Sequence, residues 1–241
     1  MIEHPSPNHG ERGPGAVVNM LLLHYTGMTN CGAALDRLCD PGVKVSAHYL
    51  VDEDGTVFRL VAEARRAWHA GVSYWRGEQD LNSCSLGIEL VNPGHEFGYR
   101  PFPEPQMAAL ERLALDLVRR HRIPPARVLG HSDVAPRRRR DPGELFDWPR
   151  LARAGVGLWP QLRPNPGGGQ TLGRGDEGPE VLELQRALAA FGYEASASGK
   201  FDDGTAMIVS AFQRHFRPAR VDGVADAETR ARLRTLIDAV G

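Results

Sequence analysis

The sequence lacks most features that would assign its 241 residues to a specialised class of protein. The three cysteines, Cys31, Cys39 and Cys84, are too few and too scattered for a disulfide framework, and none forms a Cys-x-x-Cys pair. Apolar runs such as Met20–Leu23 fall far short of the roughly 18 residues that a membrane-spanning helix needs. We therefore expect neither a disulfide scaffold, nor a cysteine-based structural zinc site, nor a membrane protein.

Neither sign of charge is in excess. Lysine and arginine total 29 residues against 30 aspartates and glutamates, which gives a formal charge of −1 and argues against a general binder of nucleic acid or anionic membranes. Hydrophobic residues make up 41% and charged residues 24%, an ordinary balance for a globular protein. The first thirteen residues have no basic segment followed by an apolar one, and no cysteine that could carry a lipid. We therefore expect a cytoplasmic location.

The composition changes once along the chain. Residues 164–175 contain five glycines and two prolines in twelve positions, a composition typical of a linker. Strand-like and helix-like patterns alternate before this segment, whereas only helical periodicity follows it. The sequence therefore predicts one domain over residues 1–163, a linker over 164–175 and a second domain over 176–241.

The first part reads as an α/β domain. Its clearest helix has apolar residues at three- and four-residue steps from Met107 to Val118, and a shorter helix is predicted over 33–38. Aspartates and a glycine at 52–55 predict the turn of a hairpin. Because strands alternate with helices, we expect a mixed β-sheet flanked by helices. The predicted strands cover residues 16–23, which lead to His24, and residues 46–51, 56–61, 85–91 and 126–131.

The second part reads as a small all-α domain of three helices. Two segments, 199–205 and 223–229, share glycine, aspartate and threonine at three-residue steps. In each segment an aspartate, Asp202 or Asp226, stands where a helix N-cap belongs. An earlier helix, Val181–Phe191, is expected to stop at Gly192. This part contains no titratable cluster, so we expect it to bind or pack rather than to catalyse.

Two histidines and one aspartate form a candidate metal site. His24 and His131 are each predicted at the end of a strand, and Asp141 comes ten residues after His131, just before a Pro-Gly turn. Two imidazoles and a carboxylate suit Zn²⁺, and three protein ligands leave a fourth position for water. The alternative interpretation is that each histidine is simply hydrogen-bonded at the end of its strand.

Glu89 is a second candidate for a functional residue. Along its predicted strand it points to one face, while Ile88 and Leu90 point to the other. A carboxylate within an otherwise apolar strand needs a partner or a chemical role. The alternative role is a salt bridge with a nearby arginine.

These residues stand in blocks that occur together, in this order, in one family. Over about residues 16–160 the chain resembles the zinc-dependent N-acetylmuramoyl-L-alanine amidases of the AmpD/AmiD type. Residues 176–241 resemble the three-helix peptidoglycan-binding domain, through Val181-x-x-Leu184-Gln185 and the two Asp-x-x-Thr segments. The blocks of the first resemblance are His24-Tyr25-Thr26-Gly27, Ser46-Ala47-His48-Tyr49, Ala67-Trp68-His69-Ala70-Gly71, Ser85-Leu86-Gly87-Ile88-Glu89, Gly130-His131-Ser132-Asp133 and Arg140-Asp141-Pro142-Gly143.

The resemblance implies roles for individual residues. His24, His131 and Asp141 become the ligands of one Zn²⁺ per chain, and Glu89 becomes the base that takes a proton from the attacking water. Arg139 stands where the family usually has a lysine that stabilises the tetrahedral intermediate, so its role narrows to electrostatics. Read alone, the run of arginines at 137–140 could also be a nucleic-acid or targeting patch.

The resemblance also implies a substrate site and a reaction. Trp68, His69 and Asn82 are expected to bind the substrate, although Trp68 could instead pack in the core beside a surface histidine. Asp80 replaces an arginine that often meets the stem peptide in relatives. The expected reaction hydrolyses the amide bond between the lactyl group of (anhydro-)N-acetylmuramic acid and L-alanine during peptidoglycan recycling. The expected partner is a muropeptide, with no nucleic acid and no membrane.

Two alternative functions stay open at this point. The chain could be an exported, periplasmic cell-wall amidase or lysin, because the family has both cytosolic and exported members. It could also be a peptidoglycan-recognition protein that binds without cutting. Loss of the third metal ligand would favour binding alone, so the presence of Asp141 favours catalysis.

Overall fold

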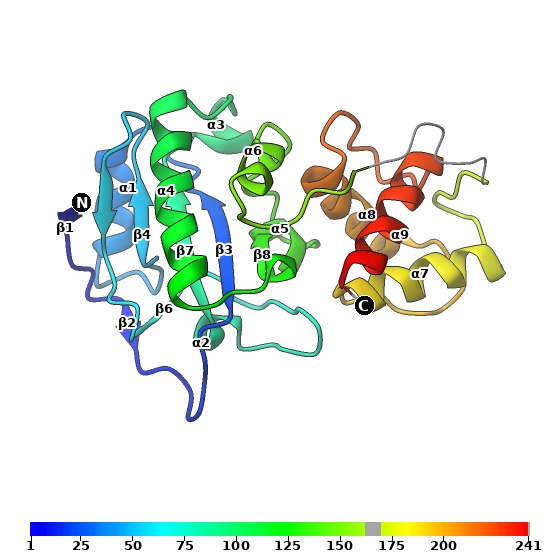
Figure 1. Cartoon of the computed structure of the whole chain (residues 1–241), viewed down its shortest axis with the longest axis horizontal. Helices are drawn as coiled ribbons and strands as arrows, with labels where there is room; N and C mark the ends of the chain where they lie inside the picture. Colours follow the sequence, from blue (N-terminus) through cyan, green and yellow to red (C-terminus); the bar gives the residue numbers. More distant parts are fainter. Residues whose placement is uncertain (162–169, 241) are drawn as a thin grey trace.

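The computed structural model describes residues 1–161 and 170–240. A β-sheet with helices packed on it forms the first part, and three helices form the second part beside it (Figure 1). Within the described residues, no helix is both long and apolar enough to cross a membrane.

The central sheet has six strands in the order β1-β5-β4-β7-β3-β8. Strand β3 lies between β7 and β8 and is parallel to both, and β7 is also parallel to β4. Strand β5 runs antiparallel to β4, so the sheet is mixed, as predicted. The hairpin predicted around residues 52–55 joins these two strands. The strands are β1 (Ile2–Glu3), β3 (Met20–Tyr25), β4 (Tyr49–Val51), β5 (Val57–Arg59), β7 (Ser85–Leu90) and β8 (Val128–Gly130), and a second sheet pairs β2 (His9–Gly10) with β6 (Arg66–Ala67).

One long helix, α4 (Glu104–Arg120), covers one face of the sheet (Figure 1). Its apolar side packs against alternate residues of β3 and β7, such as Leu23 and Ile88, in one hydrophobic cluster. The helix begins at Glu104, three residues before the predicted start at Met107. The apolar pattern does not reveal these residues because the first turn is polar. The remaining helices of this part are α1 (Cys31–Cys39), α2 (Leu81–Cys84), α3 (Gly94–Phe97), the 3-10 turn η1 (Pro125–Arg127), α5 (His131–Val134) and α6 (Trp148–Arg153).

The last predicted strand differs from the observed one. Residues Pro125–Arg127 form a 3-10 turn, the strand covers Val128–Gly130, and His131 begins helix α5. The backbone N–H of Gly130 donates to the side chain of Asp133 at 2.8 Å, which caps the new helix and ends the strand. His131 therefore follows a strand and begins a helix, and the prediction that it ends the strand was wrong by one residue.

The three predicted helices of the second part are present as α7 (Pro179–Phe191), α8 (Asp203–Phe216) and α9 (Ala227–Val240). The side chains of Asp202 and Asp226 accept the backbone N–H groups of Thr205 and Thr229 at 2.7 and 2.9 Å. Both aspartates therefore act as the predicted N-caps, and the two repeated segments make the same capping hydrogen bond.

The segment predicted as a linker lies partly outside the described residues, which omit 162–169. Its described end is anchored: Leu172 is buried, and it exchanges two backbone hydrogen bonds with Ala225, at 3.1 and 2.8 Å. Residues 172–175 therefore pack on the helical part, because the apolar side chain of Leu172 finds a place in its core.

The two parts share a hydrophobic core. Buried Trp75 and Val134 of the first part belong to the same cluster as Phe191 and Phe212 of the helical part. In Figure 1 the helical part lies beside β8, α5 and α6, with α8 next to α5. The helical part is therefore packed beside the β8 edge of the sheet and against α5, the helix that His131 begins.

Candidate active site

The candidate site forms where three neighbouring parallel strands end. His24 is the second-last residue of β3, Glu89 is the second-last residue of β7, and His131 directly follows β8. Because parallel strands present their carboxyl ends at one edge of a sheet, the three side chains meet although they come from distant parts of the chain. Asp141 joins them from the loop after α5, where its backbone carbonyl accepts the N–H of Ser132 at 2.9 Å.

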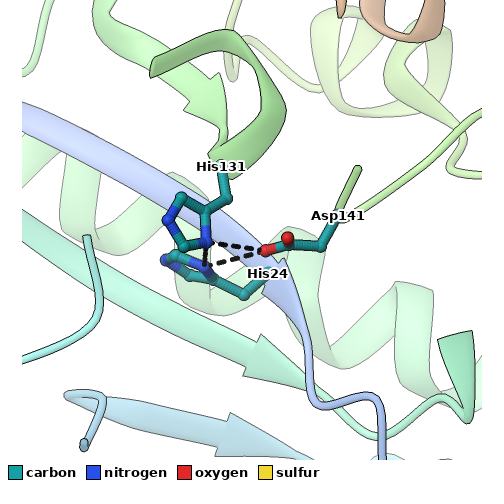
Figure 2. Close-up of side chains that lie close together, drawn as sticks. All are labelled: His24, His131 and Asp141. Carbon is teal, nitrogen blue, oxygen red and sulfur yellow. Dashed lines mark hydrogen bonds and ion pairs between the residues drawn. The ribbon is translucent and has the colours of Figure 1, made fainter. Parts of the chain in front are cut away.

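The two histidines and the aspartate converge on one point (Figure 2). The Nδ1 atoms of His24 and His131 lie 3.0 Å apart, and each is also 3.0 Å from Oδ2 of Asp141. All three residues are at most 6% exposed. A tetrahedral Zn²⁺ with ligands about 2.0–2.2 Å away separates its ligand atoms by roughly 3.3 Å, so the triangle has nearly the size that such an ion requires.

A hydrogen bond of Nε2, the His131 ring nitrogen that does not face Asp141, determines which of the two nitrogens carries the proton. Its Nε2 lies 3.0 Å from the carbonyl oxygen of Ala70. A carbonyl can only accept, so Nε2 carries the proton, and the Nδ1 atom that faces Asp141 has a free lone pair.

A longer chain of hydrogen bonds does the same for His24. The Ser85 hydroxyl donates to the carbonyl of Leu81, so its oxygen accepts from Nε2 of His69 at 3.3 Å. The other nitrogen of His69, Nδ1, then accepts from Nε2 of His24 at 3.1 Å. His24 is therefore protonated at Nε2, and its Nδ1 lone pair also faces Asp141.

This arrangement fits a cation. Two imidazole lone pairs and a carboxylate oxygen point at one another with no proton left to share between them, so a positive ion satisfies all three. Burial, followed by the neighbouring His131, lowers the pKa of His24 to about 4, which keeps its imidazole neutral near pH 7.

Glu89 lies in the same cleft and is 9% exposed. It is the register partner of His24 across β3 and β7, and its Oε2 atom is buried without a hydrogen-bond partner. Burial and the Asp141 carboxylate raise the pKa of Glu89 well above its usual range. Among the described residues, no arginine forms a salt bridge with Glu89. The structure therefore does not support the alternative role of Glu89 in an ion pair with a described residue.

The cluster opens into a cleft of about 670 Å³. Arg139 and Arg140 are exposed side chains on its wall, next to Asp141. Trp68 also lines the cleft and is half-buried, so it is not a core residue. Arg138 has a structural role, because its guanidinium donates to the carbonyl of Ala70 at 3.0 Å.

Two of the predicted substrate-binding residues have other roles. Both ring nitrogens of His69 are engaged, by His24 and Ser85, and its ring is buried, although the residue is among those that line the cleft. The Oδ1 atom of Asn82 accepts the backbone N–H groups of His69 and Ala70 at 3.0 and 2.9 Å. Among the described residues, those that line the cleft do not include Asn82.

Asp80 is also occupied. It pairs with Arg66 at 2.8 Å and accepts a hydrogen bond from the Ser83 hydroxyl at 2.7 Å. Nothing in the sequence indicates the supporting role of Ser85, because a serine within a buried strand carries no signal of its own.

Comparisons with known proteins identify the family. The family model described as N-acetylmuramoyl-L-alanine amidase matches residues 14–144, and the one described as putative peptidoglycan binding domain matches residues 177–233. N-acetylmuramoyl-L-alanine amidase AmiD of Escherichia coli K12 is 38% identical over 238 residues, which cover 93% of this chain and 84% of that protein. The 1,6-anhydro-N-acetylmuramyl-L-alanine amidase AmpD of Haemophilus influenzae is 31% identical over 60% of this chain and 86% of its own length.

Solved structures agree with the sequence matches. The complex of E. coli AmiD with anhydro-N-acetylmuramic acid-L-Ala-D-γ-Glu-L-Lys superposes with a TM-score of 0.82 at 35% identity, over 96% of this chain and 93% of that one. The complex of Pseudomonas aeruginosa AmpDh3 with anhydromuramic pentapeptide gives a TM-score of 0.79 at 33% identity, over 92% of both chains.

Fold, site and relatives together define a class of enzyme, the amide hydrolases that cleave peptidoglycan. More particularly, the chain belongs to the N-acetylmuramoyl-L-alanine amidase family, and it carries a domain of the peptidoglycan-binding type after the catalytic one.

Proposed function

We propose that the chain hydrolyses the bond between the lactyl group of anhydro-N-acetylmuramic acid and L-alanine, with one Zn²⁺ held by His24, His131 and Asp141. The metal assignment rests on the hydrogen bonds that His24 and His131 make through Nε2. These bonds leave both Nδ1 lone pairs facing Oδ2 of Asp141. When bound, a zinc ion lowers the pKa of a water molecule to about 7 and polarises a carbonyl oxygen.

Glu89 acts as the general base in this proposal. Glu89 lines the cleft beside the cluster and its Oε2 atom has no hydrogen-bond partner, so it can accept a proton from the attacking water. A divalent cation held by the cluster favours the carboxylate form of Glu89, against the burial that favours the protonated form. The proton that Glu89 accepts is then passed to the nitrogen of L-alanine, which leaves as a free amine.

Arg139 stabilises the negative charge that develops on the carbonyl oxygen. Its side chain is exposed on the cleft wall, two residues before Asp141. A guanidinium keeps its charge at all relevant pH values, so it contributes electrostatically and not as a proton donor. Trp68 offers a planar apolar ring on the same cleft, suited to the apolar face of a sugar.

The substrates proposed for the chain are small fragments released in peptidoglycan turnover. Several relatives are named 1,6-anhydro-N-acetylmuramyl-L-alanine amidases, and the AmiD complex contains an anhydromuramoyl tripeptide. A cleft of about 670 Å³ has the size of a site for a small molecule.

The test is to incubate zinc-loaded enzyme with purified anhydromuropeptides and, separately, with whole sacculi. We expect rapid release of the stem peptide from the fragments and much slower release from the sacculi. Equal or faster release from sacculi would contradict the recycling role and favour the wall-degrading alternative. The Glu89→Gln variant, measured in parallel, controls for contaminating amidases.

The cytoplasmic location stays a prediction and forms part of the proposal. Cell fractionation with a reporter fused to the carboxyl end tests it. Activity and reporter signal in the cytosolic fraction are expected, and their release with periplasmic proteins, without lysis, would favour the exported alternative.

A further inference from the structure

Asp133 connects the candidate metal site to the helical domain. It stands two residues after His131 in helix α5, and its side chain is completely buried. Its Oδ2 atom accepts the backbone N–H of Gly130 at 2.8 Å, at the point where β8 ends and His131 begins the helix. The carboxylate therefore fixes the backbone turn that carries His131.

The helical domain supplies the other partners of this carboxylate. The hydroxyl of Tyr193, just after α7, donates to Oδ1 of Asp133 at 2.6 Å. Nδ1 of His215, on α8, donates to Oδ2 at 2.7 Å. His215 also stacks on Trp148 of α6, with ring centroids 3.6 Å apart, so its imidazole is clamped within the interface. Both donors are at most 2% exposed.

A second set of contacts joins the helical domain to the loop that follows Ala70, the residue whose carbonyl accepts the hydrogen bond of His131. The carbonyl of Ala70 holds its imidazole, and the loop that continues from Ala70 leads to Trp75, which packs edge-on against Tyr193 with centroids 5.0 Å apart. The backbone N–H of Arg76 donates to the carbonyl of Gly192 at 3.0 Å. This loop projects toward α7 in Figure 1.

The fit at this contact is close. A Cβ atom on Gly192 would lie 2.6 Å from the Trp75 ring, a distance that no side chain tolerates, and its φ of +149° also favours glycine. The same loop is tied to α5, because the N–H of Tyr74 donates to the carbonyl of Val134 at 2.9 Å.

From these contacts we infer that the helical domain supports the metal site. Tyr193 and His215 hold the carboxylate of Asp133, and Asp133 in turn positions His131 as a ligand. The inference rests on the proposed function, in which His131 binds Zn²⁺. A buried carboxylate that loses a donor must relax or rehydrate, because an unpaired buried charge is costly. The relaxation moves the helix that carries His131 and the N–H of Ser132 that holds Asp141.

The experiment measures zinc affinity of the full-length chain by competition with a chelator. Tyr193→Phe keeps the ring and removes only the hydroxyl that Asp133 accepts. We expect it to bind zinc about tenfold more weakly than the parent chain, the lower end of the range for residues that support metal ligands. Faster amide hydrogen exchange at His131–Val134 should accompany this loss.

Arg232→Ala is the matched control, because Arg232 also joins the two parts, through a cation–π contact 5.3 Å from the Trp159 ring, but its ion pair is with Glu228 and not with Asp133. We expect its zinc affinity to equal that of the parent chain. Equal affinity in Tyr193→Phe and the parent, or equal losses in both variants, would overturn the inference.

A second pair of variants covers the case in which Tyr193→Phe does not fold. His215→Gln retains an N–H donor, whereas His215→Leu has none. We expect His215→Gln to retain more zinc affinity than His215→Leu, and equal affinities would overturn the role of this hydrogen bond. If the parent chain itself binds no zinc, the proposed function has failed rather than the link through Asp133.

Discussion

His24 and Glu89 are register partners on the adjacent parallel strands β3 and β7. Register partners on neighbouring strands project to the same face of a sheet, with backbones about 4.8 Å apart. The candidate ligand and the candidate base are therefore held together by the sheet itself, whereas Ile88 and Leu90, on either side of Glu89, pack into the core on the opposite face.

This pairing predicts the behaviour of Glu89→Gln. The amide has nearly the same size, so fold and zinc content should be retained, but it cannot accept the proton of the attacking water. We expect kcat to fall by about 10²–10⁴-fold, the usual contribution of a general base. Stem-peptide release from anhydromuropeptide, followed by chromatography, measures it, and a variant with near-normal kcat would require another base.

A second prediction separates charge from proton donation at Arg139. We expect Arg139→Lys to lose little kcat, because it keeps the positive charge on the cleft wall, and Arg139→Ala to lose much more. Arg137→Ala, in the same exposed run but outside the lining of this cleft, is the control and should be close to normal. Equal losses in the Lys and Ala variants would show that the shape of the guanidinium matters beyond its charge.

The hydrogen-bond chain behind His24 gives a third prediction. His69→Leu removes the acceptor for Nε2 of His24 and should weaken zinc binding by about 10–100-fold. Ser85→Ala, one step further along the chain, should have a smaller effect. Zinc affinities from chelator competition test the order, and a His69→Leu variant with unchanged affinity would contradict the assigned tautomers.

A fourth prediction concerns stability and pH at Glu63, which contacts Tyr49 of β4 and Arg120 of α4. Burial raises the pKa of Glu63, but hydrogen bonds from Arg120 and Tyr49 outweigh it and lower the pKa to about 2. A carboxyl whose pKa falls on folding stabilises the protein above its unfolded pKa near 4.5, and this contribution disappears as the pH drops toward 2.

The Glu63→Gln variant tests this difference. We expect its free energy of unfolding to be lower than that of the parent chain by about 1–3 kcal/mol at pH 7, with the gap closing between pH 4.5 and 2. Urea unfolding at several pH values measures the gap. A gap that stays constant over this range would show that Glu63 contributes through packing and not through its charge.

The sequence predicted the mixed sheet, the three C-terminal helices and the group formed by His24, Glu89, His131 and Asp141. The sheet and the helices follow from local signals, namely apolar periodicity and N-cap aspartates. Positions at the ends of predicted strands made His24 and His131 candidates together with Asp141, and the resemblance to the amidase family joined Glu89 to them. The ends of elements were less predictable: His131 begins a helix because Asp133 caps it, and that cap depends on the fold.

The supporting residues could not be read from the sequence for a related reason. His69 and Asn82 are predicted to contact substrate, and the structure adds a role within the protein for each: His69 orients His24, and Asn82 holds the backbone of residues 69 and 70. Whether a polar side chain faces a ligand or another protein group depends on contacts between distant segments. The same holds for Tyr193 and His215, which lie in a domain with no catalytic signal of its own.

The most direct test of the account is the zinc content of the purified chain, prepared without chelators and measured by plasma mass spectrometry alongside Asp141→Ala. We expect one zinc per chain in the parent protein, and a much lower zinc content with no turnover in Asp141→Ala. Removal of the metal should abolish the amidase activity of the parent, and added zinc should restore it. A parent chain without stoichiometric zinc, or an Asp141→Ala variant that keeps both its zinc and its turnover, would contradict it.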